Sequence, residues 1–176
     1  MASSQTLSDP ERRCVARWAA ACAHRVVGLY EADAESVRLI ADALARTQAY
    51  AAGASSAREE IALRMVAVKA AGSATTPAGA AAARSVAQAS AVAHMGAHAL
   101  GAAAYATKAI SLAHPGDPDA VTAEITWQLE QLSDTERDVL GRLPALGADA
   151  SGPLGPGLLT QGILGTTIRS LQAGLG

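Results

Sequence analysis

The side chains best suited to bind a ligand or do chemistry lie in one uncharged segment, residues 88–107, which holds His94, His98 and Tyr105 among small neighbours. Two histidines four residues apart share one face of a helix, where their imidazoles can chelate a transition metal. A metalloprotease is excluded because its motif requires glutamate directly after the first histidine, and Met95 stands there. The histidine pair is therefore a candidate metal or ligand site without the catalytic motif.

A metal site of this kind needs a third ligand, and the sequence does not identify one. The remaining candidates are scattered along the chain: His24, His114, Glu59, Glu60 and Glu124. The alternative is that His94 and His98 are neutral and hydrogen-bonded inside a packed bundle. We therefore expect no cofactor and no metal, with these two histidines as the candidate ligands if a metal is bound.

The aromatic residues are few, and Trp18, Tyr30, Tyr105 and Trp127 are nearly all of them. Large rings with a polar tip lie in protein cores more often than in ligand sites. The sequence contains no Gly-x-Ser-x-Gly elbow, no glycine-rich phosphate loop and no paired-cysteine motif. We expect no catalytic residues and no enzymatic activity.

The segment that positions the histidines is predicted to be the central helix of an all-α protein. The chain is 50% hydrophobic, mostly through alanine, and only 3% aromatic. Alanine is the best helix former and lets neighbouring helices approach closely. Along a helix, His94, His98 and Tyr105 fall on one stripe and the apolar residues on another, so both sides should be covered.

Capping signals and apolar periodicity predict a bundle of about five to six helices around this central one. The expected helices are 10–31, 35–52, a third from the capping box at 56–59 to Gly72, 77–113, a fifth from Asp117-Pro118, and a short sixth from Ser133 that Pro144 ends. Ile61, Met65 and Val68 form the apolar stripe of the third helix, as in an ordinary amphipathic helix. A straight helix over 77–113 would be about 55 Å long, so we expect a kink or break near Gly96 or Gly101.

Net charge and the lack of targeting signals bear on three function classes: nucleic-acid binding, secretion and membrane insertion. A net charge of −2 and a pI of about 6.1, with acids and bases interspersed, disfavour nucleic-acid binding. The first residues have no apolar core of a secretory signal, which predicts a cytoplasmic protein, and the alanine-rich segment is too polar to favour a membrane span. Cys14 and Cys22 lie about 12 Å apart on one predicted helix, so we expect reduced thiols.

The composition changes after Pro144, and we divide the chain there into a helical bundle domain, 9–143, and a Gly/Pro linker with an apolar docking segment, 144–176. Helically spaced apolar residues mark the docking segment: Ile163, Leu164, Ile168 and Leu171. Several glycines weaken any isolated helix there, so the segment should need a surface to order it.

Three segments carry a family resemblance: Cys22-Ala-x-x-Val26-x-x-x-Tyr30-Glu31, Ala93-His94-x-x-x-His98-Ala-x-Gly101-Ala-Ala-Ala-Tyr105-Ala, and Glu124-x-x-Trp127-Gln128. Over about residues 11–143 the chain resembles the bacterial putative immunity protein family. The resemblance implies a small, all-helical, cytoplasmic protein that neutralises a co-encoded toxin by direct binding. The motif positions that it carries over are Cys22, Tyr30, Glu31, His94, His98, Tyr105, Glu124, Trp127 and Gln128.

The leading hypothesis is thus a non-catalytic helical protein whose partner is another protein, a toxin. One alternative is a bundle that binds a metal or small ligand through His94 and His98. The other is a cargo or adaptor protein, because residues 163–171 are similar in character to the peptides that load cargo into encapsulin shells. The oligomeric state stays open in each case.

Overall fold

The computed structural model describes residues 3–176, and this part of the chain is all α-helical, without strands. Its elements are α1 (Asp9–Val26), η1 (Val27–Leu29), α2 (Ala34–Ala51), α3 (Ala57–Ala71), α4 (Pro77–Ala91), α5 (His98–Ala113), α6 (Pro118–Glu130), α7 (Asp134–Gly141), η2 (Leu158–Thr160) and α8 (Gly162–Ala173). These are eight α-helices within residues 3–176, where we expected five to six. The difference arises because 77–113 contains two helices and the C-terminal region contributes one.

Most helices begin at the predicted capping residues. The side chains of Ser8, Ser56 and Ser133 each accept a hydrogen bond from the backbone amide of the third helical residue, a glutamate, whose carboxylate in turn accepts one from the backbone amide of the serine. Thr76 and Asp117 cap α4 and α6, each directly before a proline. These caps satisfy amide groups that have no partner inside the helix, so they fix where each helix starts.

The predicted helix over 77–113 is broken between α4 and α5, near Gly96 as expected. The amides of Gly96 and Ala97 donate to the carbonyls of Thr6 and Gln5, both at 3.1 Å, instead of continuing a helix. A Cβ atom at Gly96 would overlap the side chain of Leu7, so only glycine lets the N-terminal segment pack here. The expectation that the two motif histidines share one helix is therefore wrong.

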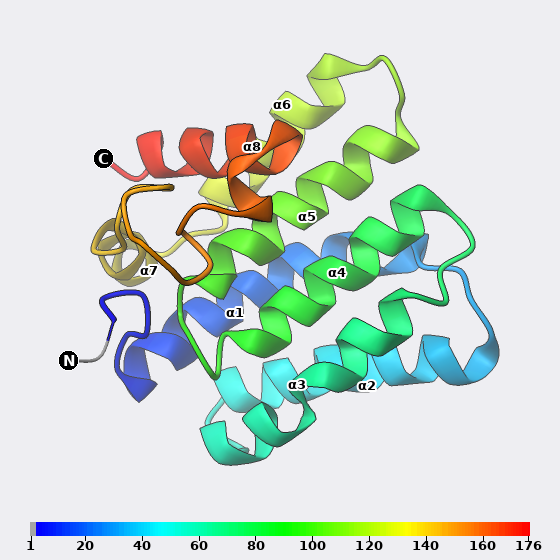
Figure 1. Cartoon of the computed structure of the whole chain (residues 1–176), viewed down its shortest axis with the longest axis horizontal. Helices are drawn as coiled ribbons and strands as arrows, with labels where there is room; N and C mark the ends of the chain where they lie inside the picture. Colours follow the sequence, from blue (N-terminus) through cyan, green and yellow to red (C-terminus); the bar gives the residue numbers. More distant parts are fainter. Residues whose placement is uncertain (1–2) are drawn as a thin grey trace.

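The central position belongs to α5. It packs against α1, α4, α6 and α8, and its contact with α4 is the most extensive between any two elements (Figure 1). Most of its residues from Ala99 to Ala109 are buried, and nearly all of them are small. Small side chains let the helix axes approach closely, and this allows one helix to be surrounded on several sides.

The C-terminal region forms a helix, α8, where we expected a Gly/Pro linker and a docking tail. In Figure 1, α8 lies beside α5 and α6, and it packs against both helices. Leu164, Ile168 and Leu171 are buried in these contacts, and Ile163 is half-buried. The surface that orders the segment is thus the chain's own bundle.

The connection to α8 is held by one buried glutamine. The Gln5 side chain is fully buried, and its amide nitrogen donates to the Asp149 carboxylate and the Ser151 carbonyl, both at 2.7 Å. Its oxygen accepts from the Leu154 amide at 2.9 Å. A buried amide with all three partners supplied ties the N-terminal segment to the linker, which gives the glycine-rich region a defined path.

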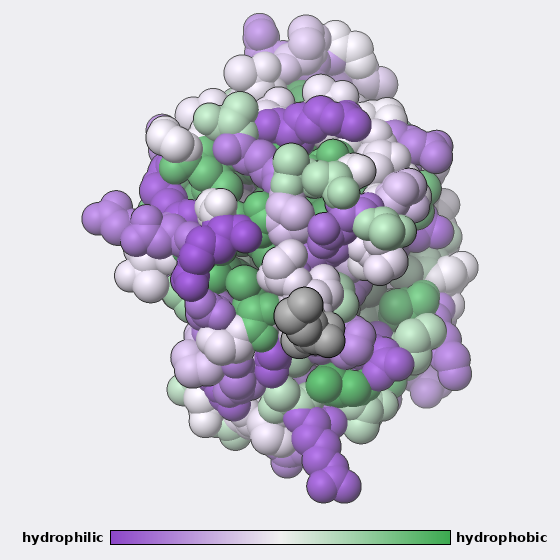
Figure 2. Space-filling model, turned by 60° about the vertical axis from the view of Figure 1, so that its left-hand side comes forward, coloured by the Kyte–Doolittle hydropathy of each residue, from purple (hydrophilic) through white to green (hydrophobic). Residues whose placement is uncertain are grey.

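The outer surface is mixed in character. On the face shown in Figure 2, apolar residues form small patches interrupted by hydrophilic side chains. Among the described residues, no helix combines the length and the apolar character that crossing a bilayer requires.

Candidate functional site

The two motif histidines lie at the start of α5 and in the turn before it. His94 is exposed in the turn, whereas His98 is the first residue of the helix and is half-buried. The Nδ1 atom of His98 lies 2.8 Å from Oε1 of Gln88 on α4, and since a carbonyl oxygen only accepts, the imidazole donates from Nδ1. Burial, with a smaller contribution from His94, lowers the pKa of His98 to about 4. His98 is therefore a neutral hydrogen-bonding group near pH 7.

The motif glycine makes room for this hydrogen bond. A Cβ atom at Gly101 would overlap the carboxamide of Gln88. Gly101 lies in the middle of α5, where glycine costs helix stability relative to alanine, so the close approach is the reason for it. His98, Gly101 and Gln88 thus form one unit across the α4 and α5 contact.

His94 and His98 border a groove of about 190 Å³ between α3 and α4, which we call the α3–α4 groove. Its walls are Arg64, Met65 and Val68 on α3 and Ala87, Gln88 and Ala91 on α4. No group of three His, Cys, Asp or Glu side chains in residues 3–176 is placed to hold a metal ion. The groove thus combines four apolar lining residues with four polar or charged ones, among them both histidines.

The orientation of α3 differs from the expectation. Its buried residues are Glu60, Ala67, Ala70 and Ala71, so alanine faces the bundle. Ile61, Met65 and Val68, which we expected in the core, form an outward stripe that we call the α3 stripe. Met65 is 49% exposed and Val68 is 48% exposed, and Ile61 is half-buried.

This orientation makes α3 the most apolar part of the exposed surface. Six large apolar side chains are exposed in residues 3–176, and two of them, Met65 and Val68, lie on the α3 stripe. Leu63 is also exposed on α3, but it lies two residues from Met65 and therefore about 200° round the helix, off the stripe. Such clusters on a protein surface mark places where another protein docks, whereas isolated apolar residues are ordinary. This surface was not predicted, because the helical spacing of its apolar residues is also typical of a face that packs in the core.

A second group of motif residues ties α6 to α1. The buried carboxylate of Glu124 accepts from Nε of Arg25 at 2.6 Å, and the Arg25 guanidinium lies 4.3 Å from the ring centre of Trp127. A buried charge that is paired and stacked in this way keeps its helix in one register. The side chains of Glu124 and Trp127 thus both contact Arg25 of the same chain.

Gln128 extends this contact into the core. The two hydrogens of its amide nitrogen are shared among three acceptors at 3.0 to 3.1 Å: the Ala103 carbonyl, the Thr107 hydroxyl and the Glu124 carboxylate. Its backbone carbonyl accepts from the Trp18 indole at 2.8 Å. Cys22 lies fully buried nearby, where burial first and then the charge of Glu124 raise its thiol pKa well above the ordinary value. Cys22 and Cys14 are both free thiols, and Cys14 is half-buried.

The remaining motif residues hold the turn after α1 and the middle of α5. The Tyr30 hydroxyl donates to the carbonyl of Ala70 at the end of α3. The Glu31 side chain is exposed, while its carbonyl accepts from the amide and the hydroxyl of Thr75 at 2.9 and 3.1 Å. Tyr105 is buried, and burial raises its pKa. The motif is therefore distributed over several contacts and does not converge on a single site.

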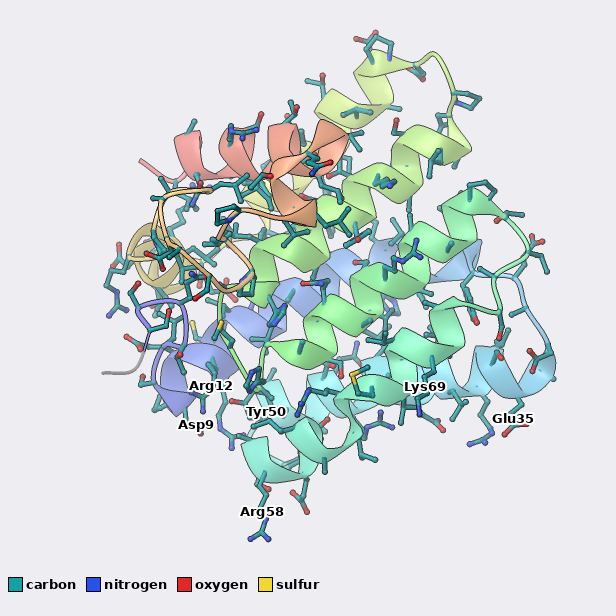
Figure 3. All side chains as sticks on the ribbon, viewed as in Figure 1. Asp9, Arg12, Glu35, Tyr50, Arg58 and Lys69 are labelled. Carbon is teal, nitrogen blue, oxygen red and sulfur yellow. The ribbon has the colours of Figure 1, made fainter. Side chains whose placement is uncertain are left out.

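A larger cleft of about 790 Å³ lies between α1, the end of α2 and the start of α7. Its arginines are already engaged: Arg13 with Asp9 at 2.8 Å, and Arg17 with the buried Glu136. Arg13 also stacks on Tyr50, whose hydroxyl donates to Asp9, and Figure 3 shows Tyr50 and Asp9 at this end of α1. The apolar lining of the cleft is formed by Cys14 and by alanines of α1 and the end of α2, so it contains no large apolar side chain.

Comparisons with known proteins give one family. No curated protein and no solved structure matches the chain. The model of the Imm-5 like putative immunity protein family matches residues 5–135, which is most of the chain and includes α1 to α6 with the α3 stripe. The match ends within α7, so α8 and the segment before it lie beyond it. The chain therefore belongs to the Imm-5 like putative immunity protein family.

Proposed function

We propose that this protein is a non-catalytic immunity protein that neutralises a toxin by binding it through the α3 stripe and the adjoining α3–α4 groove. The observation that carries the proposal is the outward direction of Ile61, Met65 and Val68, whereas the core face of α3 is mostly alanine. Leaving this apolar surface in water is unfavourable, and covering it with a partner provides binding free energy.

The surroundings of the stripe support the same role. The neighbouring face of α4 contributes the small residues Ala87 and Ala91, which leave space for a partner side chain. His98 is held neutral by burial, so it adds a polar contact without a charge that would need compensation. A flat apolar helix with a shallow groove beside it suits an extended protein surface better than a small molecule.

The test is co-expression with a candidate toxin from the open reading frames next to the gene for this chain. We expect the wild-type protein to restore growth, and Met65→Asp and Val68→Asp to lose this protection, because a charge at the centre of the interface would be buried without a partner. Leu112→Asp is the matched control, since Leu112 is 41% exposed on α5, away from the stripe. Thermal melts of the variants check folding.

Binding of the purified proteins gives the quantitative form of the same test. Each Asp variant should weaken the affinity for the toxin domain by roughly 30-fold or more, as expected for a central hot spot. Leu112→Asp should bind like the wild type. Full protection and unchanged affinity in Met65→Asp would show that the toxin is bound elsewhere.

A further inference from the structure

Cationic side chains outnumber acidic ones around the α3 stripe. Residues 57–91, which contain α3 and α4, carry four cationic side chains and two acidic ones, although the whole chain has a net charge of −2. The cationic residues are Arg58, Arg64, Lys69 and Arg84, and all four are exposed. The acidic residues are Glu59 and Glu60.

Both acids are used within the chain. Glu59 accepts from the backbone and hydroxyl of Ser56, both at 2.8 Å, and so closes the capping box of α3. Glu60 is buried at 3% exposure and accepts from the Ser55 hydroxyl at 3.0 Å, with Nε of Arg46 at 3.7 Å. Glu59 remains an exposed carboxylate, but within residues 3–176 neither acid forms an ion pair with any of the four cations.

The four cations are without acidic partners. In residues 3–176 none of them forms an ion pair, and Arg64 makes only a hydrogen bond to the Ile61 carbonyl at 3.2 Å. Most other arginines of the chain do pair, as Arg17 and Arg25 do with buried carboxylates. The α3 and α4 surface thus carries positive charge that the chain itself does not compensate.

The cations flank the apolar stripe. At 100° per residue, Arg64 and Lys69 fall on opposite sides of the stripe that Met65 and Val68 form. Figure 3 shows Arg58 and Lys69 projecting from α3 away from α4. Arg84 lies on α4 one turn before Gln88, a lining residue of the groove, and its charge is close enough to act on Tyr105.

We infer that this surface binds an acidic amphipathic segment of the partner protein, with apolar side chains on the α3 stripe and carboxylates facing Arg64, Lys69 and Arg84. The inference rests on the proposed function for the identity of the partner as a toxin and adds the chemistry of the bound segment. Complementary charge at the rim of an interface sets orientation and accelerates association, while the apolar centre supplies most of the affinity.

Nucleic acid is the other polyanion that such cations attract. The apolar stripe argues against it, because phosphates would have to lie over Met65 and Val68, where no donor is available. The chain also has a negative net charge, which opposes non-specific binding to a polyanion. Duplex DNA therefore belongs in the test as a competitor.

The test uses two synthetic helical peptides with the same leucine spacing, one with glutamate and one with lysine at the flanking positions. Fluorescence anisotropy measures the binding of each to the full-length protein. We expect the acidic peptide to bind at least tenfold more tightly, and added salt to reduce this preference. Arg64→Glu/Lys69→Glu/Arg84→Glu should abolish or reverse it.

The control changes the net charge by the same amount on other elements. Arg38→Glu/Arg142→Glu/Arg169→Glu alters three exposed arginines on α2, just after α7 and on α8, and should keep the preference for the acidic peptide. Thermal melts compare the folding of both triple variants. Equal loss of preference in the two would show that net charge, and not this surface, selects the peptide.

Three results would overturn the inference: equal binding of the two peptides, tighter binding of the basic one, or binding of neither. Displacement of the acidic peptide by duplex DNA at lower concentration would also overturn it. The failures of the two proposals are distinguishable. Loss of growth protection in Met65→Asp without peptide preference contradicts the inference alone, and peptide preference without any protection contradicts the proposed function alone.

Discussion

At the scale of single residues, the motif mainly holds the protein together. His98, Gln88 and Gly101 form one contact between α4 and α5, and Glu124 with Arg25 forms another between α6 and α1. The sequence marks these positions by residue type, but their roles depend on partners that are distant along the chain. The metal-site alternative assumed a continuous helix through both histidines, and the turn before α5 removes that assumption.

His98 should make the protein sensitive to acid. Its pKa is about 4 in the folded state against 6.5 in a free histidine, so between these values the unfolded chain binds a proton that the folded chain does not. The free energy of unfolding should therefore fall as the pH drops from about 6.5 to 4, by roughly 3 kcal/mol. Urea denaturation across this range measures it. His98→Gln should flatten the curve, and an unchanged curve would contradict the assignment.

Gly101→Ala should depend on the residue at position 88. In the wild type, the added methyl displaces the Gln88 carboxamide and breaks its hydrogen bond, which offsets the gain of about 1 kcal/mol in helix propensity. In a Gln88→Ala background the clash with the carboxamide is gone, and the gain is opposed only by the 3.3 Å approach of the added methyl to Cδ1 of Leu159. A double-mutant cycle by chemical denaturation should give a coupling of about 1 to 2 kcal/mol. Identical effects in both backgrounds would show that the close approach carries no energy.

At the scale of helices, the local signals were predictable and the packing faces were not. The capping signals at Ser56 and Ser133 predicted the starts of α3 and α7, and the break near Gly96 was predicted from length and glycine. The face that α3 turns toward the bundle was not predicted. That face consists mostly of alanine, which is too small to form a recognisable apolar pattern in the sequence. The larger residues Ile61, Met65 and Val68 gave the only visible periodicity, and it marks the outer face.

Helix α8 was the second element missed, because its glycines lower intrinsic helix propensity. Gly165 is required: a Cβ atom there would overlap the backbone carbonyl of Thr160, and Gly174 lies similarly close to Leu129. The glycines therefore permit close packing. In the sequence alone, the same glycines indicate only a low helix propensity. Tertiary contacts with α5 and α6 then stabilise the helix.

Two isoleucines on α8 provide a matched test of this packing. Ile168 is fully buried and Ile163 is half-buried. Ile168→Ala should lower the free energy of unfolding by about 2 to 4 kcal/mol, since it leaves a cavity beside α5. Ile163→Ala should cost less than about 1 kcal/mol, because the exposed part of its side chain loses little contact. Equal effects would contradict the docking of α8 on the bundle.

At the scale of the whole molecule, the structure separates a rigid interior from one uncovered face. The central helix α5 is covered by α1, α4, α6 and α8, whereas α3 packs on α2 and α4 and leaves its apolar stripe outside. Fold class and family could be predicted from composition and motif residues. The recognition surface could not, because it depends on which side of α3 faces the bundle.

The most direct test of recognition at the α3 stripe is hydrogen–deuterium exchange of the protein alone and in complex with the toxin that we propose as its partner. Peptides that cover Ile61 to Val68 and the turn at His94 should exchange more slowly in the complex, because the partner excludes water from these segments. Peptides of α6 and α8 should be unchanged. Protection confined to the cleft between α1, α2 and α7, with none on α3, would contradict the account.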